Sequence, residues 1–146
     1  MAAMQVSTPR VIAASADRIF GVLADPAQHP GIDGSGSVQA PRGDPPARLA
    51  LGSKFGMAMR IGVRYGVENE VVEFEEGRRI GWRHDAGVTW RYQLEPTGDG
   101  TTVTETCDLV TVPPALRVVL RLSGQVARNR TAMRKTLDRL ATLVEE

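Results

Sequence analysis

Cysteine is nearly missing from this sequence, and histidine is almost as scarce. The one cysteine, Cys107, cannot form a disulfide within the chain and cannot build a cysteine-rich metal site by itself. The two histidines, His29 and His84, belong to no His-Glu-x-x-His motif and to no cluster with metal-ligand spacing. We therefore expect no metal site and no cofactor.

Long apolar runs are also lacking, and none approaches the roughly 20 residues that cross a bilayer. The segment "VIAAS" is too short, and too soon followed by Asp17, for a secretion signal, so a cytoplasmic protein without a transmembrane segment is expected. A net charge of +1 gives no overall attraction to nucleic acid, and no such partner is expected. A chain of 146 residues has the length of one domain, so residues 1–146 are expected to form a single domain.

The motifs of several enzyme classes are missing as well. The sequence contains neither a G-x-S-x-G nucleophile elbow nor a phosphate-binding P-loop. The G-x-G within "GIDGSGS" precedes an expected strand and opens no helix, which is the wrong context for a dinucleotide. The catalytic residues are therefore unknown, with His84 and Glu105 as weak candidates that would have to converge on a substrate.

What the sequence does contain is a series of short segments with strand-like alternation. Strands are expected at 5–14, 35–40, 53–62, 64–75, 78–84, 88–95 and 101–111. Ser15 is a good N-cap for a short helix that Pro26 ends, and a second short helix is expected after it. Pro114 opens a long helix that runs to about Val144. This order predicts an α+β fold in which a seven-stranded, curved antiparallel sheet wraps around the C-terminal helix.

Alternation along the expected strands assigns one face of each strand to the interior. The inward set is rich in thioether and aromatic side chains, which form either plain core or the adaptable wall of a ligand cavity. The candidate ligand contacts on the sheet are Met57, Met59, Trp82, Trp90, Tyr92 and Glu105.

The long helix carries an apolar stripe at helical spacing. The stripe contains Val119, Leu122, Val126, Met133, Leu137, Leu140 and Val144. Near its centre, Val126, Asn129, Arg130 and Met133 complete the candidate ligand contacts. Arg130 either reaches water over its apolar stem or faces inward and pairs with Glu105, because a buried charge needs a partner. The opposite side carries a basic ridge, expected to be a solvated face, of Arg117, Arg121, Arg128, Lys135 and Arg139.

Three stretches, "VIAASADRIFGVLADPAQHPGIDGSGSV", "VVEFEEGRRIGWRH" and "NRTAMRKTLDRLATLVEE", give the sequence a resemblance to a known superfamily. It resembles the START-like, or SRPBCC, proteins with the birch-pollen-allergen-like helix-grip fold. Within them it is most similar to the polyketide cyclase/dehydrase and lipid-transport branch of actinobacterial type. The resemblance covers nearly the whole chain. It implies a hydrophobic cavity between the sheet and the C-terminal helix, used in that superfamily for lipids, quinones, hormones or polyketides.

The same resemblance places the Pro- and Gly-rich segment after the first helix over one end of the cavity. His29, Asp33 and Ser35 are therefore candidates for the cavity entrance. The alternative is that the segment forms a V-shaped helix pair that supports the long helix.

Three hypotheses for function follow. The first is the binding or transport of a small, largely apolar molecule, such as a lipid, a quinone or a polyketide-like aromatic, by a monomer or weak homodimer. The second is an enzyme of the cyclase, aromatase or dehydratase type acting in the same cavity. The third is an interaction module that uses the basic ridge. Fold resemblance alone does not choose among them.

Overall fold

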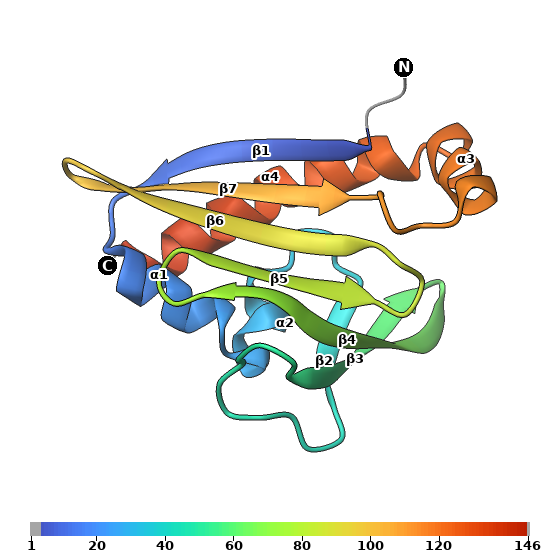
Figure 1. Ribbon diagram of the computed structural model, residues 1–146, viewed down its shortest axis with the longest axis horizontal. Coiled ribbons are helices and arrows are strands. Elements are labelled where there is room, and N and C mark those ends of the chain that lie inside the picture. The colour runs from blue at the N-terminus through green and yellow to red at the C-terminus, as the bar shows by residue number, and fades with distance from the viewer. Residues whose placement is uncertain (1–3, 146) are drawn as a thin grey trace.

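Seven strands form one antiparallel sheet in the computed structural model, which describes residues 4–145. The sheet order is β1-β7-β6-β5-β4-β3-β2, so consecutive strands from β2 to β7 are neighbours and β1 adds to β7 (Figure 1). The two edge strands, β1 and β2, each contain a proline, Pro9 and Pro41. The strands are β1 (Gln5–Ile12), β2 (Val38–Arg42), β3 (Lys54–Ile61), β4 (Val63–Glu75), β5 (Arg79–His84), β6 (Thr89–Thr97) and β7 (Gly100–Asp108). The predicted fold class is confirmed.

Two short helices and a 3-10 turn follow the first strand: α1 (Ala16–Leu23), η1 (Pro26–Gln28) and α2 (His29–Ile32). Ser15 caps α1, because its hydroxyl oxygen accepts the backbone N–H of Arg18 over 3.2 Å. The Asp25 carboxylate does the same for η1 by accepting the N–H of Ala27 over 3.0 Å. The segment after β1 thus begins with two helical elements, each of which has its own side-chain cap.

The prediction of one long C-terminal helix is wrong in one respect, because the structure divides it into α3 (Pro114–Leu122) and α4 (Gln125–Val144). Gly124 has a φ of 80°, and its N–H bonds the carbonyl of Arg121 over 3.1 Å, which is how a glycine terminates a helix. The apolar stripe is interrupted there. Val119 and Leu122, expected on its buried side, are 57% and 84% exposed.

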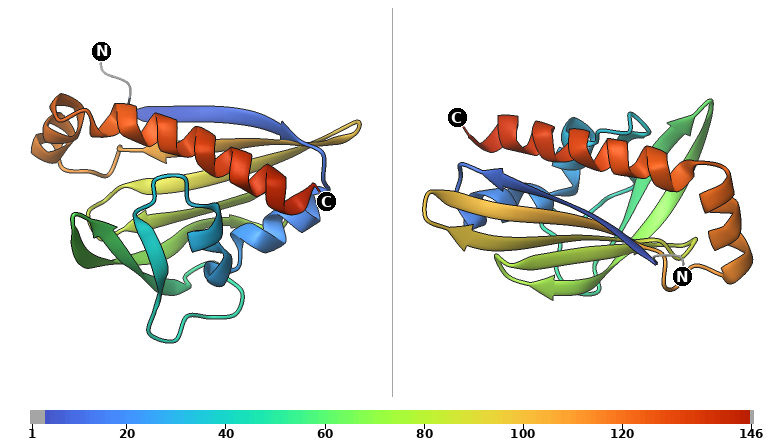
Figure 2. Two further views of the ribbon diagram at one scale, coloured as in Figure 1. Left: turned by 180° about the vertical axis from the view of Figure 1, so that it is seen from behind. Right: turned by 90° about the horizontal axis from the view of Figure 1, so that it is seen from above.

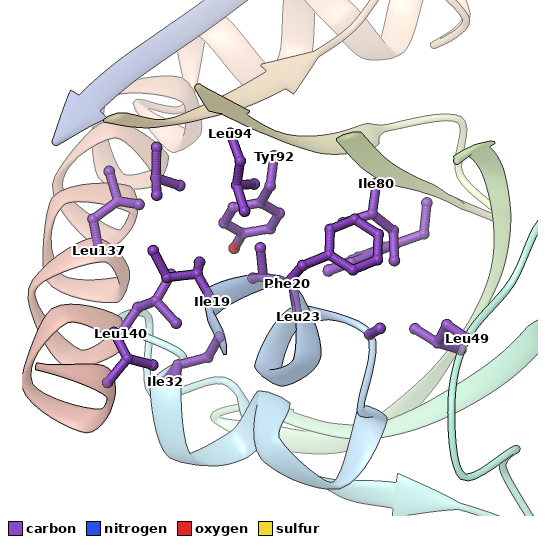
Figure 3. Packing of buried hydrophobic residues seen from close by; sticks show 14 of the residues in the cluster. Ile19, Phe20, Leu23, Ile32, Leu49, Ile80, Tyr92, Leu94, Leu137 and Leu140 are labelled. Atoms are coloured by element: carbon purple, nitrogen blue, oxygen red, sulfur yellow. The ribbon is translucent and has the colours of Figure 1, made fainter. Parts of the chain in front are cut away.

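Helix α4 crosses one face of the curved sheet, whereas α3 lies at the end of the molecule away from the C-terminus (Figure 2). The apolar side of α4 is buried through Met133, Leu137, Leu140, Ala141 and Val144. Helix α1 packs Ile19, Phe20 and Leu23 into the same core (Figure 3). The core is therefore concentrated between α1, the second half of α4 and the sheet, which leaves the first half of α4 over the cavity described next.

Candidate ligand-binding cavity

A cavity of about 390 Å³ lies between the sheet and the first half of α4. The predicted ligand contacts that line it are Met57, Met59, Trp82, Trp90, Tyr92, Glu105, Asn129 and Met133. The strand register explains why the aromatic residues meet there: Trp82 on β5 lies directly opposite Trp90 on β6. Ile61 and Tyr65 also line the cavity and are exposed, so it reaches the surface beside the β3–β4 hairpin.

The structure does not place Arg130 or Val126 in the cavity wall. Arg130 is exposed, and Glu105 takes Tyr92 as its partner, so the inward alternative for Arg130 is wrong. Val126 is half-buried in a separate apolar cluster with Cys107 and Leu109. Helical periodicity locates the buried side of α4 only approximately, and the angle at which α4 crosses the sheet decides which residues at its margin face the cavity.

His29 lies in the wall, although it was predicted at the entrance. Its ring is buried and stacks on Trp82 with the ring centroids 4.7 Å apart and the planes 21° from parallel. Its Nε2 donates to the carbonyl oxygen of Leu23 over 2.8 Å, so Nε2 carries the proton. Burial lowers the pKa of His29, which favours the neutral ring.

Asp33 and Ser35, the other predicted entrance residues, both line the cavity and form a compact turn. The Asp33 carboxylate accepts the hydroxyl of Ser35 over 2.7 Å and the backbone N–H of Val38 over 3.1 Å. The turn is joined to α4, because the N–H of Gly34 donates to the Thr136 hydroxyl over 2.8 Å. These contacts fit the supporting role that the sequence left as an alternative.

Glu105 is 3% exposed and lines the cavity from β7. The Tyr92 hydroxyl donates to its Oε2 over 3.0 Å, whereas Oε1 has no hydrogen-bond partner among the residues described. Burial, helped by the charge of Asp33 and opposed by the hydrogen bond from Tyr92, raises the pKa of the Glu105 carboxyl to about 8. The acid is therefore largely protonated at neutral pH, and Tyr92 keeps its proton because burial and Glu105 raise its own pKa.

Asn69 is a polar wall residue that the sequence interpretation missed. It is 4% exposed, its Nδ2 donates to the Phe55 carbonyl over 3.4 Å, and its Oδ1 has no partner among residues 4–145. Because a carbonyl oxygen only accepts, the atom of the Asn69 amide that faces it must be the nitrogen. An asparagine between Val67 and Val71, at the alternate positions of one strand, was the available signal.

His84 and Glu105, the weak catalytic candidates, both line the cavity but lie on β5 and β7 with β6 between them. Burial lowers the pKa of His84. Cys107 is buried, and burial raises the pKa of its thiol to about 12, so it is a poor nucleophile. Within the described part of the chain, no three His, Cys, Asp or Glu residues are grouped so that they could hold a metal ion.

The predicted basic ridge is not continuous, because its members are divided between α3 and α4. Arg117 on α3 donates to the carbonyl of Val110, and Arg139 on α4 donates to the carbonyl of Asp33. These two side chains of the ridge therefore form hydrogen bonds with the protein's own backbone. In residues 4–145, no helix has the length and apolar character needed to cross a membrane.

The family model described as polyketide cyclase / dehydrase and lipid transport matches residues 3–145. The chain belongs to this family. The predicted resemblance is thereby confirmed. An uncharacterized protein of Mycobacterium tuberculosis, Rv0088, is 37% identical over 108 residues, which are 71% of this chain and 47% of the relative. The chain thus spans about half the length of that curated relative.

Solved structures of low sequence identity share the family fold. The KanY protein, solved by NMR, has a TM-score of 0.78 at 13% identity, with 100% of each chain covered. Protein NE0264 from Nitrosomonas europaea has a TM-score of 0.72 at 17% identity, covering 96% of this chain and 93% of that one. These likenesses show the helix-grip fold.

Proposed function

We propose that this polyketide cyclase / dehydrase and lipid transport family member binds one small, mainly apolar, ring-containing molecule in its cavity. A volume of about 390 Å³ lies in the range of small-molecule sites, roughly 300–1,000 Å³. The family description supports ligand binding in general. The nature of the ligand is inferred from the wall.

The observation that carries the proposal is the aromatic arrangement around Trp82. His29 stacks on one side of it, and the rings of Phe55 and Tyr92 approach with centroids at 5.7 and 5.6 Å. Such rings offer flat, weakly polar surfaces to a planar ligand. Met57, Met59 and Met133 supply the remaining wall, and their flexible thioethers adapt to its outline.

Two measurements test the proposal. Native mass spectrometry of the purified protein detects a retained ligand, and titration with the uncharged probe N-phenylnaphthylamine is expected to change Trp82 and Trp90 fluorescence and to raise the melting temperature. Met59→Trp is expected to fill the cavity and remove probe binding. The control Val11→Trp, at an exposed site on β1, is expected to retain it. Equal binding to the Met59→Trp protein, or none to the wild type, contradicts the proposal.

An acid–base enzyme of the cyclase, aromatase or dehydratase type is the second candidate. It is favoured by the protonated Glu105 carboxyl in the cavity wall, since a general acid acts best with a pKa near the working pH. Turnover of an identified ligand that is lost in Glu105→Gln, while binding persists, would favour the enzyme over the carrier.

A further inference from the structure

Glu105 is an unusual residue to find in an apolar cavity wall, and its unpartnered oxygen sets a condition on the ligand. One carboxyl oxygen is held by Tyr92, whereas Oε1 is buried without a partner in the described residues. Buried polar atoms are nearly always hydrogen-bonded, because leaving one unpaired forfeits the bonds it makes in water. A ligand that pairs with Oε1 would recover that loss.

The surroundings of Glu105 determine which kind of partner Oε1 accepts. The titratable groups that act on it are Tyr92 on β6, Asp33 before β2, and Cys107 on the same strand, and none of them is a cation. Directly opposite on β1 is Thr8. Helix α4 contributes the cavity-lining residues Asn129, Ala132, Met133 and Thr136, which do not titrate. The carboxyl is therefore in its neutral form. Because Oε2 accepts from Tyr92, the hydrogen is assigned to Oε1, which can donate it to an acceptor on a ligand.

The charges around the cavity disfavour an anionic ligand. The two histidines in the wall, His29 and His84, have lowered pKa values and supply no positive charge. Asp33 contributes negative potential on the same side as Glu105. A carboxylate or phosphate group placed beside the buried Glu105 carboxyl would lack a counter-ion, which is costly.

We propose that the ligand is an uncharged, ring-containing molecule with a carbonyl-type oxygen that accepts a hydrogen bond from Glu105 Oε1. This inference rests on the proposed binding function and makes it specific. Tyr92 is a positioning residue, since its hydroxyl occupies Oε2 and leaves Oε1 to the ligand. The inference separates a neutral ketone, ester or quinone from a free fatty acid, which carries a carboxylate.

Four matched probes with one ring system and one attachment point test it: methyl naphthyl ketone, isopropylnaphthalene, naphthoate and naphthylethylamine. The ketone and the hydrocarbon have nearly the same shape and differ in the acceptor oxygen. Calorimetric titration near neutral pH is expected to give an affinity for the ketone about tenfold above that for the hydrocarbon. Naphthoate is expected to bind more weakly than the ketone because it lacks a counter-ion, and the amine because its ammonium group offers no acceptor to Oε1.

Variants assign the preference to Glu105. In Glu105→Leu the ketone and the hydrocarbon are expected to bind equally, because the donor is gone. In Glu105→Gln the amide still donates, so the preference is expected to remain and to become independent of pH. In the wild type it is expected to fade as the pH rises through about 8. Glu95→Gln, at an exposed site on β6, is the matched control and is expected to behave as the wild type.

The outcomes separate this inference from the binding function itself. If none of the four probes binds, the proposed function and the inference both fail. If the ketone and the hydrocarbon bind the wild type equally, or if Glu105→Leu keeps the ketone preference, the inference fails and the cavity stands. Tighter binding of naphthoate or of the amine than of the ketone overturns it in favour of a charged ligand.

Discussion

Tyr92 and Glu105 lie directly opposite each other on β6 and β7, and the Tyr92 hydroxyl donates to the Glu105 carboxyl over 3.0 Å on the face of the sheet that lines the cavity. Glu105 therefore pairs with Tyr92 and not with Arg130, which the sequence analysis gave as one possible partner. The bond leaves the Glu105 carboxyl without a counter-ion, so the folded state favours its neutral form.

The stability of the fold is expected to depend on the ionisation of Glu105. Its pKa rises from an ordinary 4.5 to about 8 on folding, so the folded state holds a proton that the unfolded state has lost between those values. The contribution of Glu105 to the free energy of unfolding should therefore fall as the pH rises from about 4.5 to about 8. Urea titrations at several pH values should show this decline to be weaker in Glu105→Gln and unchanged in Glu95→Gln. Parallel curves for all three proteins would contradict it.

The opposite dependence is expected for His29. Its pKa is lowered from 6.5 by burial, so the unfolded state takes up a proton first as the pH falls below that value. The stability of the wild type relative to His29→Phe should decrease as the pH drops below about 6.5, whatever the difference at higher pH. His84 is present in both proteins and cancels in the comparison. A difference that does not change with pH would show that His29 does not titrate on unfolding.

Gly34 should tolerate no side chain. A Cβ atom there would lie 2.3 Å from the carbonyl oxygen of Ala132 and 2.6 Å from the backbone nitrogen of Thr136. Because both contacts are to the α4 backbone, Gly34→Ala is expected to destabilise the fold by about 1–3 kcal/mol or more. Gly31→Ala, where a Cβ meets nothing within 4 Å, is the control and should be neutral or slightly stabilising. Thermal unfolding of the two variants checks this, and similar melting temperatures would refute the close approach.

Arg91 should contribute more to the free energy of unfolding than Arg42, an arginine that is paired at the surface. It is 14% exposed on the face of β6 opposite Tyr92, and it joins Glu73 over 2.5 Å and Asp108 over 3.1 Å. Arg91→Ala leaves Glu73 with only the longer contact to Arg79 at 3.7 Å and removes the cation beside the shielded carboxylate of Asp108, so it is expected to cost about 3 kcal/mol. Arg42→Ala breaks only an exposed contact at 4.0 Å to Glu68 and should cost less than about 1 kcal/mol. Chemical denaturation measures both, and equal losses would refute the distinction.

The sheet could be predicted from the sequence because its information is local. Strand alternation and turn residues separate β3 to β7 along the chain, and consecutive strands in such an order pair with each other. The break at Gly124 was not predicted, although Ser123 and Gly124 are visible in the sequence, because the apolar spacing continues across them. Periodicity detects which positions are apolar, but it does not detect the turn that one glycine introduces.

The site was predictable only in part for a related reason. Residues in the strands, such as Trp82 and Trp90, have a face fixed by the period of two, and both line the cavity. His29 begins the four-residue helix α2, and its position on Trp82 depends on how that short helix packs in three dimensions. Arg130 stands at the margin of a helical face, where a small rotation moves a side chain from the cavity to solvent.

The prolines in the two edge strands also limit how copies of the chain can associate. A strand from another molecule that joined β1 or β2 would need an unbroken row of backbone donors, and Pro9 and Pro41 each remove one. The open sheet is thereby protected at both ends against continuous edge-to-edge polymerisation. Because the missing N–H groups are a property of the backbone and carry no charge, this protection does not depend on salt or pH.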